Sequence, residues 1–442
     1  MSNIPLLEAL KFWLKLGFIS FGGPAGQIAL MHRELVDRRR WISERRFLHA
    51  LNYCMLLPGP EAQQLATYLG WLMHRTCGGI LAGALFVLPS LAILVGLSAV
   101  YVVYGHLPFV AGLFYGIKPA VAAIVLHAVW RIGSRTLRHP RQTPALCAIA
   151  AASFVAIAVL AIPFPWVIAA AALAGVMGAR WAPSQFAMAG GGHAASAAAH
   201  APALIDDDTP APDHARFSRR RLACVVAVGL ALWLLPMALL VMAQGWQGTL
   251  TQMAWFFSKA AMLTFGGAYA VLPYVYQGAV EHHQWLSGAQ MMDGLALGES
   301  TPGPLIMVVA FVGFLGGWAR QVLGPDALFL GATLAACVVT WFTFLPSFIF
   351  ILAGGPLVES TRGQLRFTAP LTAITAAVVG VIASLGLVFL SHVGWGPAGL
   401  DLVALALTAL ALWALAGRGW NVMAVIAGCG ALGLGLRLTG VA

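Results

Sequence analysis

Two carboxylates stand beside proline-glycine-proline triplets in apolar sequence. Glu61 directly follows Pro58-Gly59-Pro60, and Glu299 stands just before Thr301-Pro302-Gly303-Pro304. A carboxylate beside a helix break can take up a proton in exchange for a substrate, whereas at the start of a helix Glu61 could equally act as a cap. The chain also offers neutral side chains that could hydrogen-bond an oxyanion: Gln27, Gln63, Gln64, Thr67, Ser300 and Thr301.

Both triplets must interrupt a helix. Proline lacks the N–H group that a helix needs and pushes the preceding residue out of helical geometry. The triplets lie within apolar stretches, at 47–74 and 290–318, and two further breaks are predicted at Phe21-Gly22-Gly23-Pro24 and Gly266-Gly267. Lipid cannot hydrogen-bond an opened backbone, so a break at membrane depth must face protein or water.

Four half-helices would begin after these breaks, following Gly23, Pro60, Gly267 and Pro304. The unpaired N–H groups and the dipole at each such end favour anions. Four ends in two matched pairs could therefore point at one anion site, as broken helices do in secondary transporters. The alternative is that these sequences only kink packed helices.

Two lysines, Lys15 and Lys259, stand inside apolar segments. A charge at bilayer depth costs at least ~2.5–3.5 kcal/mol on insertion scales, so it should face a partner or a cavity. Each lysine could be the counter-charge of a bound anion, and each could equally extend its ammonium group to the membrane surface. Both interpretations stay open at this point.

Nothing in the sequence indicates a metal centre, a cofactor or an enzyme active site. The 6 cysteines form no Cys-x-x-Cys pair, and no metal-ligand spacing recurs among the histidines. Walker, HExxH and GxSxG motifs are absent. The net charge of +10 is better explained by membrane orientation than by nucleic-acid binding. We therefore predict no catalytic residue, no metal, no cofactor and no nucleic-acid partner.

The composition is that of a membrane protein. Of 442 residues, 60% are apolar and 9% are charged, and the mean hydropathy is +0.85. Apolar segments of about 20 residues, each long enough to span a bilayer, recur along the chain. The strands of an outer-membrane barrel would instead alternate. The predicted fold class is an all-α polytopic integral membrane protein.

The chain contains an internal repeat. Residues 12–60 align without a gap on residues 256–304, a shift of 244, with 12 of 49 positions identical. A shift of 257 then aligns Leu88-Pro89-Ser90 with Leu345-Pro346-Ser347. These matches divide the chain into four parts: an N-terminal repeat, 1–181; a hydrophilic linker, 182–221; a connecting transmembrane helix, 222–245; and a C-terminal repeat, 246–442. The linker is rich in Ala, Gly, His, Asp and Pro, and is predicted to be disordered.

The distribution of arginine predicts that the repeats are inverted relative to each other. The loop at 31–46 carries six arginines, and the loop at 131–143 and the end of the linker are also basic, so all three should be cytoplasmic. The equivalent loop of the second repeat, 275–290, has no Lys or Arg. Three apolar segments separate the first two basic loops, so one of them, the Pro58-Gly59-Pro60 segment, should be re-entrant.

The predicted topology has about 9 crossings and 4 re-entrant segments, with the amino terminus inside and the carboxyl terminus outside. The connecting helix supplies the odd crossing that inverts the second repeat. A competing topology has 13 crossings with the same ends, and it would place the six-arginine loop outside. Two repeats in one chain can complete a pseudo-dimer, so a monomer and a homodimer both stay open.

Motifs in both repeats resemble the chromate ion transporter family. They are Phe21-Gly22-Gly23-Pro24, Trp41 and the run Pro58-Gly59-Pro60-Glu61-Ala62-Gln63-Gln64-Leu65-Ala66-Thr67-Tyr68-Leu69-Gly70, then Thr264-Phe265-Gly266-Gly267 and Thr301-Pro302-Gly303-Pro304. The resemblance covers almost the whole chain, as in long two-domain bacterial members. It implies a multi-pass protein of the bacterial inner membrane that exports chromate and confers chromate resistance. Sulfate-related roles are also described for the family.

The expected function is therefore secondary transport of a tetrahedral oxyanion, driven by membrane potential, a proton gradient or both. Two alternatives stay open: a carrier of sulfate or another oxyanion, and a membrane-embedded enzyme acting on an anionic lipid. The expected anion site comprises these residues: Lys15, Gly22, Gly23, Pro24, Gln27, Pro58, Gly59, Pro60, Glu61, Gln63, Gln64, Lys259, Gly266, Gly267, Glu299, Thr301, Pro302, Gly303 and Pro304.

Overall fold

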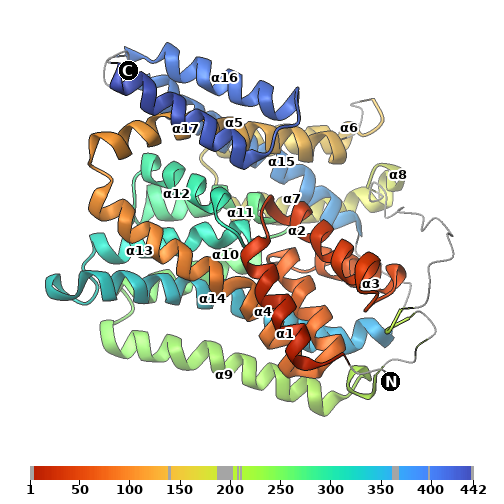
Figure 1. Ribbon diagram of the computed structural model, residues 1–442. Helices are drawn as coiled ribbons and strands as arrows, with labels where there is room; N and C mark the ends of the chain where they lie inside the picture. Colours follow the sequence, from red (N-terminus) through yellow and green to blue (C-terminus); the bar gives the residue numbers. More distant parts are fainter. Residues whose placement is uncertain are drawn as a thin grey trace.

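The computed structural model is built almost entirely of helices. It describes residues 4–137, 141–186, 203–206, 209, 212–360, 368–396 and 399–439. Helices of the first repeat (red and orange in Figure 1) lie beside those of the second (green and cyan), and α4 contacts both α13 and α14. The two repeats therefore share one packed structure.

The first repeat and the segment after it contain eleven helical elements in the described residues. They are α1 Leu6–Ile19, α2 Gly23–His32, the π-helix η1 Arg33–Arg38, α3 Glu44–Leu56, α4 Glu61–Tyr104, α5 Pro108–Thr136, α6 Pro144–Ala158, α7 Phe164–Trp181, α8 Pro183–Phe186, the short 3₁₀ helix η2 Asp213–Ala215 and α9 Arg219–Gln244.

The second repeat continues with helices and one very short hairpin. Its elements are α10 Thr249–Leu263, α11 Ala268–Tyr276, the π-helix η3 Gln277–His282, α12 Gly288–Ser300, η4 Leu305–Met307, α13 Val308–Ala319, η5 Pro325–Ala327, α14 Leu328–Ser360, α15 Thr368–Gly394, β1 Trp395–Gly396, β2 Gly399–Leu400, α16 Leu402–Ala416 and α17 Val422–Leu438. The strands β1 and β2 pair antiparallel.

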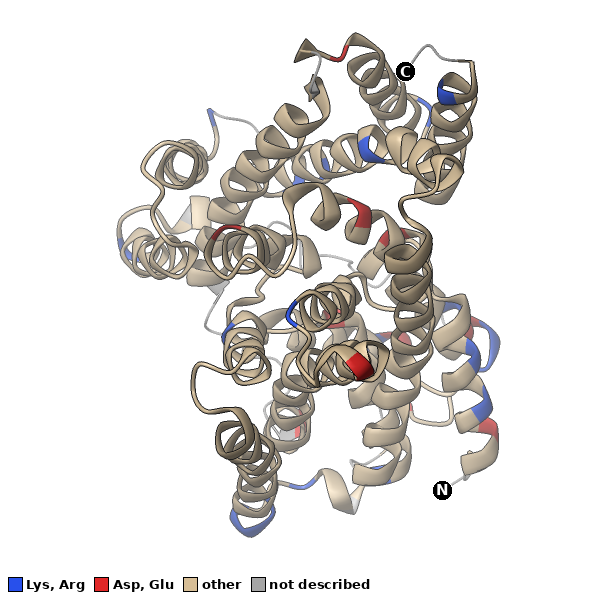
Figure 2. Ribbon diagram, turned by 90° about the vertical axis from the view of Figure 1, so that its left-hand side faces the viewer, with Lys and Arg blue, Asp and Glu red and all other residues tan. Residues whose placement is uncertain are grey.

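Six helical stretches in the described residues are long and apolar enough to cross a membrane: Glu61–Tyr104, Pro108–Thr136, Phe164–Trp181, Arg219–Gln244, Pro325–Glu359 and Ala369–Gly394. Four shorter apolar helices accompany them: Pro144–Ala158, Leu305–Ala319, Leu402–Ala416 and Val422–Leu438. Most of the ribbon in Figure 2 is tan, and charged residues gather mainly near the N-terminus. The prediction of an all-α polytopic membrane protein is confirmed.

All four predicted helix breaks are present. Helix α1 ends at Ile19, α3 at Leu56, α10 at Leu263 and α12 at Ser300, and a new helix begins within five residues of each end. The longest of these four helices has 15 residues, which is about 22 Å at 1.5 Å per residue and falls short of a hydrocarbon core of ~30 Å. The number of full crossings stays a prediction.

Helix α4 turns sharply within its first part. His74 and Arg75 have non-helical dihedral angles, with φ +59° at Arg75. The residues before the turn then pack on those after it, because a Cβ added to Gly70 would lie 2.5 Å from both Gly78 O and Ala82 Cβ. The stretch that follows Pro60 is therefore one arm of a tight helical hairpin, as a re-entrant segment requires.

The shift of 244 found in the sequence also relates local structures. Helix α3 and helix α12 span equivalent residues, and the π-helices η1 and η3 do so as well. Ser43 and Ser287 cap α3 and α12 in the same way, by accepting a hydrogen bond from the N–H three residues later. Arg40 and Gln284 both have φ +52°. These stretches of the two repeats fold alike although most of their residues differ.

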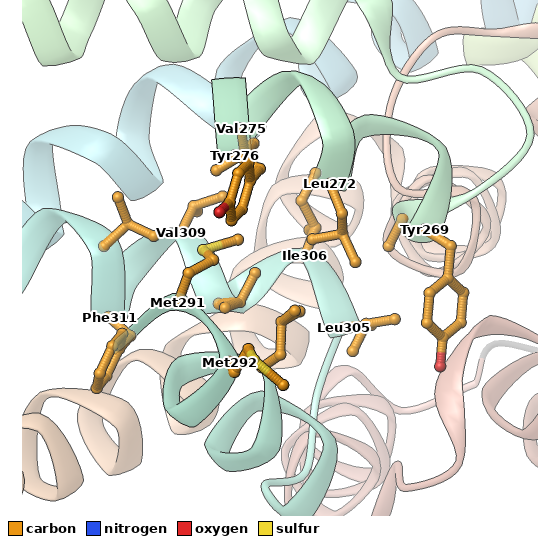
Figure 3. Packing of buried hydrophobic residues seen from close by; sticks show 14 of the residues in the cluster. Tyr269, Leu272, Val275, Tyr276, Met291, Met292, Leu305, Ile306, Val309 and Phe311 are labelled. Carbon is orange, nitrogen blue, oxygen red and sulfur yellow. The ribbon is translucent and has the colours of Figure 1, made fainter. Parts of the chain in front are cut away.

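The largest apolar core lies around the second break. Leu305 and Ile306, which follow Pro304 directly, are almost fully buried. Figure 3 shows them between Leu272 of α11 and Met292 of α12. Burial of apolar side chains contributes roughly 25 cal/mol per Å², so this packing fixes where the chain runs after the break.

Part of the linker is ordered, contrary to the prediction of disorder. Ile205 forms a parallel bridge with Ile42, and its N–H donates to Trp41 O at 3.0 Å while Ser43 N donates to its carbonyl at 3.1 Å. Farther along, a ring nitrogen of His214 lies 2.9 Å from Trp71 O. The polar composition suggested a free linker, but its backbone groups find partners on the first repeat. Residues 187–202 of the linker lie outside the described residues.

Candidate anion site at the crossed helix breaks

Each Pro-Gly-Pro break crosses the Phe-Gly-Gly break of the opposite repeat. The N–H of Gly59 donates to Thr264 O at 2.7 Å, and the N–H of Gly303 donates to Ser20 O at 2.9 Å. Gly59 is equivalent to Gly303 and Ser20 to Thr264 under the shift of 244. Such reciprocal contact is what a two-fold axis produces between like units. The four breaks thus meet as two matched crossings.

Only glycine fits at the centre of each crossing. Gly59 has φ +128° and Gly303 has φ +110°, a region that L-residues with a side chain rarely adopt. A Cβ on Gly59 would lie 2.6 Å from Gln64 Nε2 and nearer still to Ser347 Oγ, and one on Gly303 would lie 2.6 Å from Ser90 Cβ. Ser90 and Ser347 are the equivalent residues of the repeated Leu-Pro-Ser sequence, so both crossings rest on the same kind of support.

Glutamine side chains hold the crossings together. Gln27 Nε2 donates to Gly303 O at 2.5 Å and to Ser20 O at 3.3 Å, which ties α2 to the opposite break. Gln64 Nε2 donates to Pro58 O at 2.8 Å and to Ser347 Oγ at 3.4 Å. Gln63 Nε2 donates to Thr67 Oγ1 at 3.0 Å. Gln27 and Gln64 thus contact the breaks, whereas the hydrogen bond of Gln63 stays within α4.

Several polar atoms at the crossings are buried without a partner. Within the described residues these are the Oε1 atoms of Gln27, Gln63 and Gln64 and the hydroxyls of Ser20 and Ser90. All five side chains are at most 1% exposed. Buried polar groups are normally hydrogen-bonded, so unpaired groups gathered at two equivalent places mark these crossings as a candidate ligand site. The two hydroxyls can each donate to an oxyanion.

The Phe-Gly-Gly breaks add backbone donors. Gly22 and Gly266 have φ +88° and +78°, and Gly23 and Gly267 have φ +70° and +96°. Among the described atoms, none of these four N–H groups meets an acceptor. Helices α2 and α11 begin at these places, with Pro24 in the first turn of α2. Unpaired N–H groups at a helix start favour an anion.

The two predicted carboxylates lie in different surroundings. Glu299 is buried and accepts a hydrogen bond from the hydroxyl of Tyr269. Glu61 is the first residue of α4, directly after Pro60, and is partly exposed. In the first turn of α4 the Glu61 carboxylate can stabilise the start of the helix. Because the side chain is partly exposed, it can also bind a proton. The structure does not bring the two carboxylates together.

The rest of the second break is buried. Thr301, Pro302 and Pro304 are all buried. The hydroxyl of Thr301 donates to Gly298 O at 3.2 Å, and Pro304 precedes η4. Thr301 therefore caps its own helix rather than offering a free donor.

The two lysines lie on exposed faces of their helices. Lys15 is on the exposed face of α1, opposite the buried Trp13 and Leu16. Lys259 is likewise exposed on α10, with its Nζ 5.6 Å from the ring of Trp255. Exposed positions on outer helices suit side chains that extend to the membrane surface, so the structure favours that interpretation over a counter-charge.

The prediction missed four hydroxyl residues at the crossings: Ser20, Ser90, Thr264 and Ser347. Each is a hydroxyl residue in both repeats, because Ser20 aligns with Thr264 and Ser90 with Ser347. A hydroxyl retained in both copies within apolar sequence was the signal that could have identified them.

Comparison with known proteins identifies the family of the chain. The sequence profile described as "Chromate transporter" matches residues 7–176 and 251–434. The chain belongs to the chromate transporter family. The two matched stretches fall in the two repeats and leave out the linker and all of α9. No solved structure matches the chain.

Chromate transport proteins from several bacteria align with most of the chain. One from Pseudomonas aeruginosa is 33% identical over 377 residues, 84% of this chain and 78% of that protein. One from Cupriavidus metallidurans is 29% identical over 379 residues, 85% and 80% of the two chains. A probable chromate transport protein of Synechococcus elongatus is 27% identical over 378 residues, 86% and 83%.

Proposed function

We propose that this protein exports chromate across the bacterial inner membrane as a secondary transporter and thereby confers chromate resistance. The observation that carries the substrate is the family match over both repeats. The apolar spans agree with a carrier embedded in the bilayer. The family match favours transport over the alternative of an enzyme acting on an anionic lipid.

The proposed anion site lies at the two crossings. The supporting features are the unpaired hydroxyls of Ser20 and Ser90, the free N–H groups of the Phe-Gly-Gly breaks, and the starts of α2 and α11. Each supplies a donor or a positive dipole end and none a fixed positive charge. Such a site can hold a dianion by hydrogen bonds and still release it.

We further propose that the repeats are inverted in the membrane. The reciprocal contacts support a two-fold relation between the repeats, but they do not orient the axis. The orientation rests on the sequence, because the loop at 31–46 has six arginines and its equivalent at 275–290 has none. An axis in the membrane plane would let one set of crossings open alternately to each side.

The membrane potential suffices to drive export. Moving a dianion out of a negative-inside cell gains about 4.6 kcal/mol per 100 mV, twice the ~2.3 kcal/mol for a single charge. No ATP hydrolysis is needed. Glu61 and Glu299 stand beside the breaks and can add proton coupling.

The test is chromate flux with purified protein in liposomes under an imposed potassium-diffusion potential. Chromate should accumulate on the positive side and equilibrate when the potential is collapsed. Flux no greater than in empty liposomes would refute transport. Added sulfate separates the substrates: a fall in chromate flux of up to about two-fold at equal sulfate concentration would favour the general oxyanion carrier, whereas unchanged flux in excess sulfate would favour a chromate-selective one. Turnover of anionic lipid without flux would point to the enzyme.

A further inference from the structure

An ion pair with a buried carboxylate joins the two repeats. Asp293 of α12 accepts a hydrogen bond from the hydroxyl of Tyr101 at 2.8 Å, and its Oδ2 lies 3.8 Å from Lys118 Nζ. The three residues come from α12 of the second repeat and from α4 and α5 of the first. The other ion pairs described for this chain join residues between Glu8 and Glu44. Charged residues inside membrane segments are costly and usually functional.

The carboxylate of Asp293 is incompletely paired. Its residue is 3% exposed, and Oδ1 has no hydrogen-bond partner among the described residues. An unpaired carboxylate oxygen in a dry place is costly, and a proton on Oδ1 would remove that cost. Lys118 differs, because its side chain is 34% exposed and is not enclosed by protein.

Within the described residues, Lys118 is the one charged group that acts on Asp293. Tyr101 is held between the rings of Phe114 and Phe311, with centroids 5.2 and 5.3 Å away. Helix α12 also packs on α13, α15 and α17. Helix α13 carries no charged side chain. His392 of α15 lies beside Gly288, and Arg437 of α17 beside Gly112 of α5, so Tyr101 and Lys118 are the groups that act on Asp293.

The equivalent residues of the first repeat also lie close together, but without an acid and through a different contact. The shift of 244 places His49 at the position of Asp293, and the shift of 257 places Val358 at that of Tyr101. His49 Nε2 lies 3.4 Å from Val358 O. The packing of these helices therefore does not require a carboxylate. An acid at only one of two equivalent positions indicates a role beyond packing.

Asp293 is well placed to act on a break. It lies seven residues before Ser300, the last residue of α12, which is about 10 Å along the helix at 1.5 Å per residue. It is also five residues from the start of α12, and Tyr101 is three residues from the end of α4. The predicted topology puts the start of α12 and the end of α4 on the outer side of the membrane. Both Asp293 and Tyr101 would then be within reach of external protons.

We propose that Asp293 is a proton-binding site that couples chromate movement to proton movement, with Lys118 as its counter-ion; this inference rests on the proposed transport function. A proton from water binds the lone pair of Oδ1, and the carboxyl group becomes neutral. Lys118 then loses its counter-ion and turns to water, while Tyr101 keeps its hydrogen bond. The ion pair no longer holds α12 to α5, and the break at its end can move. Loss of the proton restores the pair.

The experiment records chromate flux and internal pH in the same liposomes with an enclosed pH dye. Wild type should change internal pH when chromate moves. In Asp293→Asn the pH change should be at least 10-fold smaller than in wild type, while the rate of chromate-for-chromate exchange should stay within 2-fold of the wild-type rate. Asp401→Asn is the matched control: Asp401 also accepts from a tyrosine hydroxyl, that of Tyr115, and caps α16. Asparagine can still cap, so this variant should keep the pH change.

A second variant removes the risk that an unpaired Lys118 unfolds the protein. Asp293→Asn/Lys118→Met eliminates both charges and should still exchange chromate without a pH change. A normal pH change in Asp293→Asn or in the double variant overturns the inference. Wild-type flux with no pH change at all also overturns it and leaves the proposed function intact, whereas absence of wild-type flux overturns the proposed function.

Discussion

Alanine at the crossing glycines should damage both folding and transport. At Gly59 the backbone angle of φ +128° costs a residue with a side chain about 1–3 kcal/mol. The added Cβ would also press on Gln64 Nε2 and Ser347 Oγ, and overpacking of this kind costs about 1–3 kcal/mol. The sum for Gly59→Ala is roughly 2–6 kcal/mol, and the same reasoning holds for Gly303→Ala.

The residues nearest to each added Cβ predict which second substitution should restore part of the lost stability and flux. Ser347→Ala removes the nearest atom to a Cβ at Gly59 and should recover part of the loss. Ser90→Ala should not help Gly303→Ala, because the atom nearest to the new Cβ is Ser90 Cβ, at 2.6 Å. Ser90→Gly removes that atom and should help. Backbone strain remains in every case, so no rescue should be complete.

The assay is thermal unfolding of purified variants, followed by chromate flux in liposomes. Each glycine variant should lower the apparent Tm by about 5 °C or more and reduce flux at least 10-fold. Gly96→Ala is the control, because Gly96 lies within α4 with open space around its Cβ position, and alanine is the better helix former. Wild-type Tm and flux in Gly59→Ala would refute the crossing geometry, as would rescue of Gly303→Ala by Ser90→Ala.

Three further predictions concern other residues. Lys15→Met and Lys259→Met should each keep chromate flux within 2-fold of wild type, because both side chains are exposed; a 10-fold loss would support a role of the lysines in the anion site. Gln27→Leu leaves the carbonyls of Ser20 and Gly303 without their side-chain donor, so flux should fall about 10-fold, and unchanged flux would contradict the role of this contact. Burial lowers the pKa of His283, in the loop before α12, from 6.5 to about 4. The folded protein thus favours neutral His283. The contribution of this residue to the free energy of unfolding is fully present above pH 6.5 and is lost as the pH falls toward 4. His283→Gln should show a smaller drop in Tm over this range than wild type, and an equal drop would count against it.

The four breaks were predictable because they depend on local chemistry. Proline and paired glycines interrupt a helix wherever they stand, and the structure breaks at both Pro-Gly-Pro triplets and both Phe-Gly-Gly sequences. The repeat was predictable for a similar reason, since a gapless match needs only the sequence. The shift that aligns Trp41 with Trp285 also aligns two π-helices that no local pattern indicated.

The partners of the breaks were beyond the sequence because they are long-range contacts. Gly59 meets Thr264, 205 residues away in the chain, and no local preference predicts that Pro-Gly-Pro should pair with Phe-Gly-Gly. The lysines were expected near an anion from their cost in a membrane alone. Which face of α1 or α10 they occupy depends on packing, and both side chains are exposed in the structure.

Chromate binding at equilibrium tests the proposed anion site most directly. The double variant Ser20→Ala/Ser90→Ala removes both unpaired hydroxyl donors with little change of volume, and hydrogen bonds to charged groups contribute about 1.5–3 kcal/mol each. The control is Ser98→Ala, because Ser98 is also buried on α4 with an unpaired hydroxyl in the described residues but lies eight residues beyond Ser90. The account predicts a Kd for chromate raised at least 10-fold in the double variant and unchanged in the control. An unchanged Kd in the double variant would contradict it.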